Sequence, residues 1–85
     1  MSTVKVNDIR KLIDQVNFKG IEYSNSDSLF DIGILDSLKT IQLILLIEKK
    51  MNITIDQADL KIEDFENVDL LVDYINKRID KYEFR

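Results

Sequence analysis

Asp31-Ile32-Gly33-Ile34-Leu35-Asp36-Ser37-Leu38 is the stretch that decides how this 85-residue chain folds. It ends a polar segment, contains one of the two glycines, and leads into the most apolar helical pattern of the chain. Gly33 allows the backbone to bend before that helix. Asp36 is placed to cap the helix by accepting a hydrogen bond from an N–H one turn in. The stretch therefore predicts a loop that bends sharply and delivers Ser37 to the first turn of a helix.

The helix that follows, predicted over residues 37–51, carries more apolar residues than a simple amphipathic pattern. At 3.6 residues per turn these residues fall into two arcs. The first arc, which should meet the core, consists of Leu43, Ile44, Ile47 and Met51. The second consists of Leu38, Ile41 and Leu45, and the polar remainder holds Lys39, Gln42, Lys49 and Lys50, with Leu46 among them. A small domain has difficulty burying both arcs, so we expect the second to be a partly exposed docking stripe, with burial as the alternative.

Two further amphipathic helices and one short helix are predicted from periodicity and capping residues. The first covers residues 4–16, begins at a cap formed by Thr3 or Asn7, and has an apolar face of Val6, Ile9, Leu12, Ile13 and Val16. The short helix covers residues 59–65 and is marked by Leu60, Ile62 and Phe65. The last covers residues 68–81 after a cap at Asn67, with an apolar face of Val68, Leu71, Val72, Ile75 and Ile79, widened by Leu70 and Tyr74.

The segment between the first two long helices, residues 17–36, shows no periodicity. It contains Gly20 and the polar run at residues 24–28, which is typical of a loop. Long loops in compact domains are usually functional. We expect it to be ordered, with a short helical turn near residues 28–30, and pinned to the core by its apolar side chains: Phe18, Ile21, Tyr23, Leu29, Phe30 and Ile34.

The predicted fold class is all-α: a small four-helix bundle of three main helices and one short helix, with the long loop between the first two. Residues 52–56 turn the chain, and Ile53 and Ile55 form an extended piece with no second strand to pair with. The whole chain, residues 1–85, is one domain with a core from about residue 4 to 80 and a tail that frays from Lys77 onward.

Composition excludes several classes of function. The chain has no histidine and no cysteine, which removes the usual general base and the softer metal ligands, and no loop has EF-hand spacing. A net charge of −4 argues against nucleic-acid binding, and no apolar run is long enough to span a membrane. No signal peptide is visible. We therefore expect a non-catalytic cytoplasmic monomer without a metal site.

Charge is distributed unevenly along the chain. Between residues 56 and 73 seven acids stand against Lys61 alone, whereas the helix at residues 37–51 has three lysines and only Glu48. The acidic region is either a solvated face or a surface that steers a partner.

The pattern Asp31-x-Gly33-x-x-Asp36-Ser37-Leu38 resembles the attachment motif of the acyl carrier protein and peptidyl carrier protein family. The resemblance extends over the loop and helix pattern from about residue 4 to 79. It implies that a phosphopantetheinyl transferase moves 4'-phosphopantetheine from coenzyme A onto Ser37, and that the thiol of this arm carries acyl or aminoacyl groups as thioesters. It also implies that Asp36 adjoins the site where the transferase and its metal act. Without the resemblance, Ser37 would read as an ordinary polar residue of a first helical turn.

Two features narrow the kind of carrier that the chain resembles. Carriers of fatty-acid synthesis typically show acids along the second helix, where this chain has Lys39 and Gln42. Gly33-Ile34-Leu35-Asp36-Ser37 is instead similar to D-alanyl carrier proteins and to stand-alone carriers of specialised pathways, whose arm is loaded by an adenylating ligase. We therefore expect a carrier of a dedicated pathway, with acyltransferases or synthases as further partners. A housekeeping fatty-acid carrier is the alternative.

A hypothesis from another class of function is a non-carrier interaction module. It would bind a partner helix through the stripe of Leu38, Ile41 and Leu45. Hydrolysis by Ser37 would need a lysine or carboxylate as its base, and no such residue stands out.

Overall fold

The computed structural model describes residues 4–55 and 61–83 of the chain. They form three helices, α1 (Val6–Val16), α2 (Ser37–Met51) and α3 (Val68–Glu83), and one 3₁₀ helix, η1 (Ile62–Phe65). No strand occurs among these residues. The predicted all-α bundle with a long loop after the first helix is confirmed.

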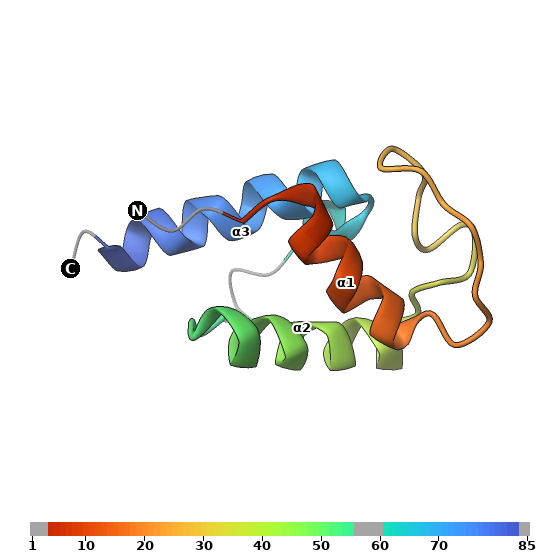
Figure 1. The fold of residues 1–85 in the computed structure, drawn as a ribbon, viewed down its shortest axis with the longest axis horizontal. Helices are drawn as coiled ribbons and strands as arrows, with labels where there is room; N and C mark the ends of the chain where they lie inside the picture. The colour runs from red at the N-terminus through yellow and green to blue at the C-terminus, as the bar shows by residue number, and fades with distance from the viewer. Residues whose placement is uncertain (1–3, 56–60, 84–85) are drawn as a thin grey trace.

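The helices are arranged around α1, which packs against both α2 and α3, while η1 packs on α3 (Figure 1). In the view of Figure 1, α2 and α3 run in the same direction and α1 crosses obliquely between them. The long loop lies at the end of the molecule where α1 ends and α2 begins. Ser37 is therefore presented at the loop end of the bundle.

The core is built from the apolar faces that periodicity predicts. From α1 it takes Ile9, Leu12, Ile13 and Val16, from α2 Leu43, Ile44 and Ile47, and from α3 Val68, Leu71, Ile75 and Ile79. Phe65 of η1 is fully buried and its ring lies 5.8 Å from that of Tyr74, centroid to centroid. Ile53 and Ile55 are also buried, and the backbone N–H of Ile55 donates to Glu48 Oε2.

Two apolar residues lie elsewhere than predicted. Phe18 is 71% exposed and does not pin the loop, and Leu70 is 44% exposed and does not widen the buried face of α3. Both predictions were wrong because hydrophobicity alone does not show which neighbours a side chain meets. Phe18 lies in the turn that the Asn17 side chain closes. Leu70 lies between the buried residues Val68 and Leu71 in the sequence of α3, but it falls outside the buried face of the helix.

The helix ends agree in part with the prediction. Asn67 Oδ1 accepts the hydrogen bond of the Leu70 N–H, as predicted for the cap of α3. α1 begins later than predicted, and its cap position is Lys5, whose backbone N–H donates to Asp8 Oδ2. Asn7 lies within the helix and does not cap it, because Lys5, two residues earlier, already adopts the extended cap conformation. The other predicted cap, Thr3, lies outside the described residues.

The last two predicted elements differ in length. Of the predicted short helix, residues 62–65 form the 3₁₀ helix η1, and Asp59 and Leu60 lie outside the described residues. α3 continues to Glu83, beyond the predicted end and through the residues expected to fray. Val4 ties the start of the chain to α3, since its N–H donates to Asn76 Oδ1 and its carbonyl accepts from Asn76 Nδ2. Among the described residues, no helix is long and apolar enough to cross a membrane.

Candidate functional site

The bend before α2 is held by one carbonyl group. The backbone N–H groups of Ile34 and Leu35 both donate to the Leu29 carbonyl, at 3.0 and 2.9 Å. Gly33 has φ +88°, a conformation that side chains disfavour, so glycine is what permits this turn. Leu29, Ile34 and Leu35 are all buried. The chain is therefore fixed in place immediately before Asp36, as expected from the position of Gly33.

The preceding turn is fastened to the junction of η1 and α3. The Ile32 N–H donates to the Ser28 carbonyl at 3.1 Å, which forms the expected helical turn without a full helix. The Leu29 N–H donates to the Glu66 carbonyl at 2.8 Å, and Ser28 Oγ donates to Glu66 Oε2. The position of Ser37 thus depends on contacts with residues far along the chain.

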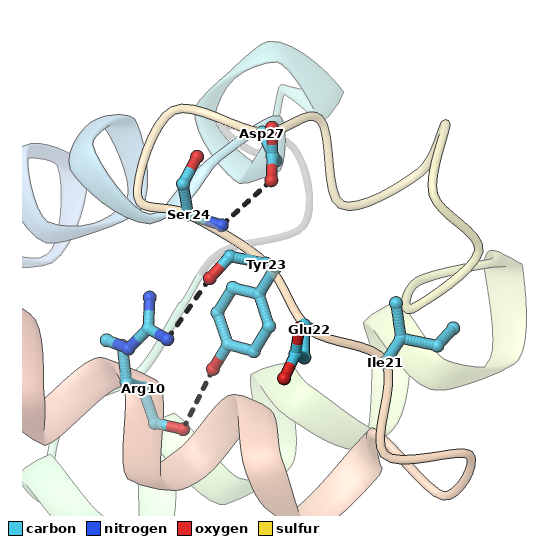
Figure 2. A pocket seen from close by; sticks show the side chains of 6 residues that line it. All are labelled: Arg10, Ile21, Glu22, Tyr23, Ser24 and Asp27. Carbon is cyan, nitrogen blue, oxygen red and sulfur yellow. Dashed lines mark hydrogen bonds between the residues drawn. The ribbon is translucent and has the colours of Figure 1, made fainter.

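The outer part of the loop is anchored to α1 through Arg10 (Figure 2). Arg10 donates to the Tyr23 carbonyl and to Asn25 Oδ1, at 3.2 and 2.8 Å, and its guanidinium carbon lies 4.1 Å from the Tyr23 ring centroid. The Tyr23 hydroxyl donates to Asp14 Oδ1 at 2.8 Å. Burial, followed by this bond to Asp14, raises the pKa of Tyr23 to about 12. These contacts make the loop an ordered part of the fold, as predicted.

Ser37 is the first residue of α2, and its side chain is exposed. Asp36 adopts an extended conformation, and its Oδ1 accepts the hydrogen bond of the Lys39 N–H at 2.8 Å. The predicted cap is therefore confirmed. Asp36 is also exposed, so an acidic residue directly precedes Ser37 at a solvent-facing helix N-terminus. Such a terminus favours a phosphate group through its N–H groups and its dipole.

An apolar groove of about 580 Å³ adjoins Ser37. It is lined by Phe30 of the loop, by Asp36, Ser37, Thr40, Ile41 and Ile44 around the start of α2, and by Ile62 of η1. The hydroxyl of Thr40 is buried and has no hydrogen-bond partner in the part of the chain that the structure describes. A buried hydroxyl without a partner is unfavourable. The groove therefore has apolar walls, with the polar residues Asp36, Ser37 and Thr40 around the start of α2.

The second apolar arc of α2 is exposed, as predicted. Leu38, Ile41 and Leu45 retain 65%, 50% and 59% of their accessible surface, whereas Leu43, Ile44 and Ile47 of the first arc are buried. Ile62 is 67% exposed and lines the same groove as Ile41. Large exposed apolar residues that adjoin one another mark interaction surfaces. The arc continues from Ser37 along the outer side of α2.

Sequence reasoning found Ser37, Asp36 and the stripe but not Phe30, Thr40 or Ile62 as neighbours of the serine. Thr40 is three residues after Ser37, so helical spacing could have placed it on the same side. Phe30 and Ile62 carry no such signal, because only the tertiary fold brings them to the groove. Among the described residues, no group of three or more acidic side chains is placed to hold a metal ion.

The family model described as "Phosphopantetheine attachment site" matches residues 8–75, a range that contains Ser37 and all of α2. Similar curated proteins are D-alanyl carrier proteins of streptococci. That of Streptococcus suis is 28% identical over 75% of this chain and 81% of its own length. That of Streptococcus mutans is 26% identical over 82% and 89%, and that of Streptococcus pyogenes serotype M5 is 31% identical over 73% and 78%. No solved structure gives a significant match.

Proposed function

Because the chain belongs to the phosphopantetheine attachment family, we propose that it is the carrier of a dedicated pathway, with its arm joined to Ser37 and with D-alanine or a similar small acid as cargo. The cofactor of the family is 4'-phosphopantetheine, whose terminal thiol supplies the thioester chemistry. The observation that carries the assignment to Ser37 is its position: an exposed hydroxyl on the first residue of α2, next to the Asp36 cap and the apolar groove.

The site fits such a group. The phosphodiester formed on Ser37 would lie at the N-terminus of α2, where helix N–H groups and the dipole favour negative charge. The uncharged part of the arm suits the groove, whose apolar walls are Phe30, Ile41, Ile44 and Ile62.

In the attachment step, Ser37 Oγ forms a bond to the phosphorus of coenzyme A that bears the pantetheine. The bond from that phosphorus to the adenosine-phosphate part breaks, this part leaves with the electron pair, and the hydroxyl proton passes to the transferase. We propose that Asp36 assists by contacting the transferase and its metal, since it is an exposed acidic residue at the helix terminus and directly precedes Ser37. The chain itself would then be the substrate of its partner enzymes and perform no catalysis.

The similarity to D-alanyl carrier proteins supports an adenylating ligase as the loading partner and a small amino acid as the cargo. Lys39 and Gln42 argue against a carrier of fatty-acid synthesis, because the enzymes of that pathway recognise acidic residues along the second helix of their carriers. The stripe of Leu38, Ile41 and Leu45 would be the surface on which the partners dock. We further propose that the carrier works as a monomer in the cytoplasm, where coenzyme A and ATP are available.

The test of the attachment site is incubation with coenzyme A and a promiscuous phosphopantetheinyl transferase, followed by intact-protein mass spectrometry. The protein should gain the mass of one arm, and Ser37→Ala should gain none. Ser26→Ala is the matched control, since Ser26 is an exposed loop serine and its loss should leave the gain unchanged. Absence of a gain, or a gain in Ser37→Ala, would leave the non-carrier interaction module as the better hypothesis.

The cargo is tested on the arm-bearing protein. We expect it to accept D-alanine from a D-alanine-activating ligase with ATP, and to be a poor acceptor for a malonyl-transferring enzyme of fatty-acid synthesis with malonyl-coenzyme A. The reverse preference would identify a fatty-acid carrier. Alanine substitutions of Leu38, Ile41 and Leu45 should slow loading, whereas Leu70→Ala, which removes an exposed leucine from α3, should not.

A further inference from the structure

A second groove lies on the other side of α2, between this helix and the end of α1. It measures about 410 Å³, and its apolar walls are Val16, Phe18, Leu45 and Leu46. Gln15, Gln42 and Lys49 complete the lining. Leu45 belongs both to this groove and to the exposed arc that begins at Ser37, so a protein docked here would also lie along that arc.

The backbone of Phe18, whose ring is exposed at the edge of this groove, belongs to a hydrogen-bonded turn. Phe18 is the first residue after Asn17, whose side chain closes a turn: Asn17 Nδ2 donates to the Ile21 carbonyl at 2.8 Å, and Asn17 Oδ1 accepts from the Ile21 N–H at 3.1 Å. Gly20, with φ +63°, donates its N–H to the Asn17 carbonyl. Because the turn already fixes the backbone, little backbone freedom is lost when a partner covers the ring, and exposed aromatic residues of this kind serve as binding anchors.

The groove is positively charged although the chain as a whole has a net charge of −4. Lys39 Nζ lies 5.4 Å from the Phe18 ring centroid, and Lys49 is part of the lining. No carboxylate lines the groove among the described residues.

The acids on the neighbouring elements are engaged elsewhere. Glu48 of α2 accepts from the Ile55 N–H at 2.8 Å, and Asp14 of α1 accepts from the Tyr23 hydroxyl at 2.8 Å. Glu63 of η1 and Asp69 of α3 are exposed acids, and neither residue lines the groove. The groove beside α2 and the surface formed by η1 and α3 therefore carry charge of opposite sign.

We propose that this groove receives an enzyme partner whose docking surface presents an apolar side chain surrounded by carboxylates. The partner's apolar group would enter between Phe18, Leu45 and Leu46, and its carboxylates would meet Lys39 and Lys49. Complementary charge of this kind selects partners and speeds encounter. The inference rests on the proposed function only in taking the partner to be an enzyme that acts on the arm. It explains why α2 carries lysines where a carrier read by basic partners would carry acids.

The experiment uses the ¹⁵N-labelled, arm-bearing protein and two designed helical peptides as probes. One peptide presents leucines flanked by glutamates, and the other has every glutamate replaced by lysine. The acidic peptide should shift the amide resonances of Phe18, Lys39, Leu45 and Lys49, with binding that weakens as salt is added. The basic peptide should leave them unchanged. Equal binding of the two peptides, or shifts centred on η1 and α3, would overturn the proposal.

Charge reversal in the protein supplies the second measurement. Lys39→Glu and Lys49→Glu should each weaken binding of the acidic peptide by about twofold to fivefold. Lys61→Glu is the matched control: it makes the same change in net charge on an exposed lysine outside the groove, and it should have no effect. An equal loss in all three variants would show that only net charge matters and would refute the site.

Failure of this inference and failure of the proposed function are distinguishable. If Ser37 acquires no arm but the unmodified protein still prefers the acidic peptide at this groove, the carrier function falls and the surface assignment stands. If the arm is attached and loaded but the lysine variants bind like the unaltered protein, the surface assignment falls alone.

Discussion

Replacement of Asp36 by alanine or by asparagine separates the structural role of this residue from its proposed role in arm attachment. In the structure its Oδ1 accepts one hydrogen bond, from the Lys39 N–H at 2.8 Å, at the start of α2, a helix with one face buried in the core. Asparagine retains an oxygen in that position and removes the charge. Alanine removes both.

The expected losses follow from these contacts. Loss of a capping side chain costs about 1 kcal/mol of the free energy of unfolding, within a range of about 0.5–2. Loss of the negative charge at the helix N-terminus costs about 0.3–1 kcal/mol more. Asp36→Ala should therefore lose about 1–2 kcal/mol, and Asp36→Asn no more than about 1. For a domain of this size the alanine variant should melt roughly 4–16 °C lower.

The assay is urea unfolding followed by far-ultraviolet circular dichroism, run on both variants and on the unaltered protein with equal slopes required. Rates of arm attachment are then measured for the same three proteins at a temperature where all are folded. We expect both variants to be modified slowly, because both lack the carboxylate. A stability of Asp36→Ala equal to that of Asp36→Asn would refute the capping argument. Attachment to Asp36→Asn at the unaltered rate would show that the residue acts as a cap alone.

Three further predictions concern the segment that positions Ser37. Leu29→Ala should lower the free energy of unfolding by about 2–5 kcal/mol, because the side chain is fully buried, whereas Leu70→Ala on the surface should cost far less; both are measured by urea unfolding. Gly33→Ala should cost about 1–2 kcal/mol from its φ of +88° alone, since a Cβ there would meet no atom within 4 Å, and a cost near zero would contradict the backbone argument. The Tyr23 pKa, raised from 10.0 to about 12, means that the fold favours the neutral phenol, so this contribution to stability is complete below pH 10 and is lost as pH rises through about 12. Difference absorbance titration against Tyr23→Phe should show a late phenolate transition, and an ordinary pKa for Tyr23 would contradict the contact with Asp14.

Local sequence determined most of the helices and their caps, because the interactions responsible lie within one or two turns. The apolar spacing of α1, α2 and α3 follows from the 3.6-residue period, and Asp36 and Asn67 cap their helices through N–H groups three residues away. Gly33 marked the bend because only glycine adopts its conformation at low cost. The motif around Ser37 was recognisable for the same reason: its residues are neighbours in the chain.

The tertiary structure decided what lies beside the serine and which apolar side chains stay exposed. Phe30 and Ile62 reach the groove at Ser37 from a loop and from η1, and no periodicity links them to α2. Phe18 stands exposed over Lys39 because the Asn17 turn projects it from the core. Burial is a property of the packed chain and not of a residue's own hydrophobicity. The motif that leads us to propose Ser37 as the attachment residue was therefore visible in the sequence, whereas the surfaces that surround it, one apolar and one basic, exist only in the folded protein.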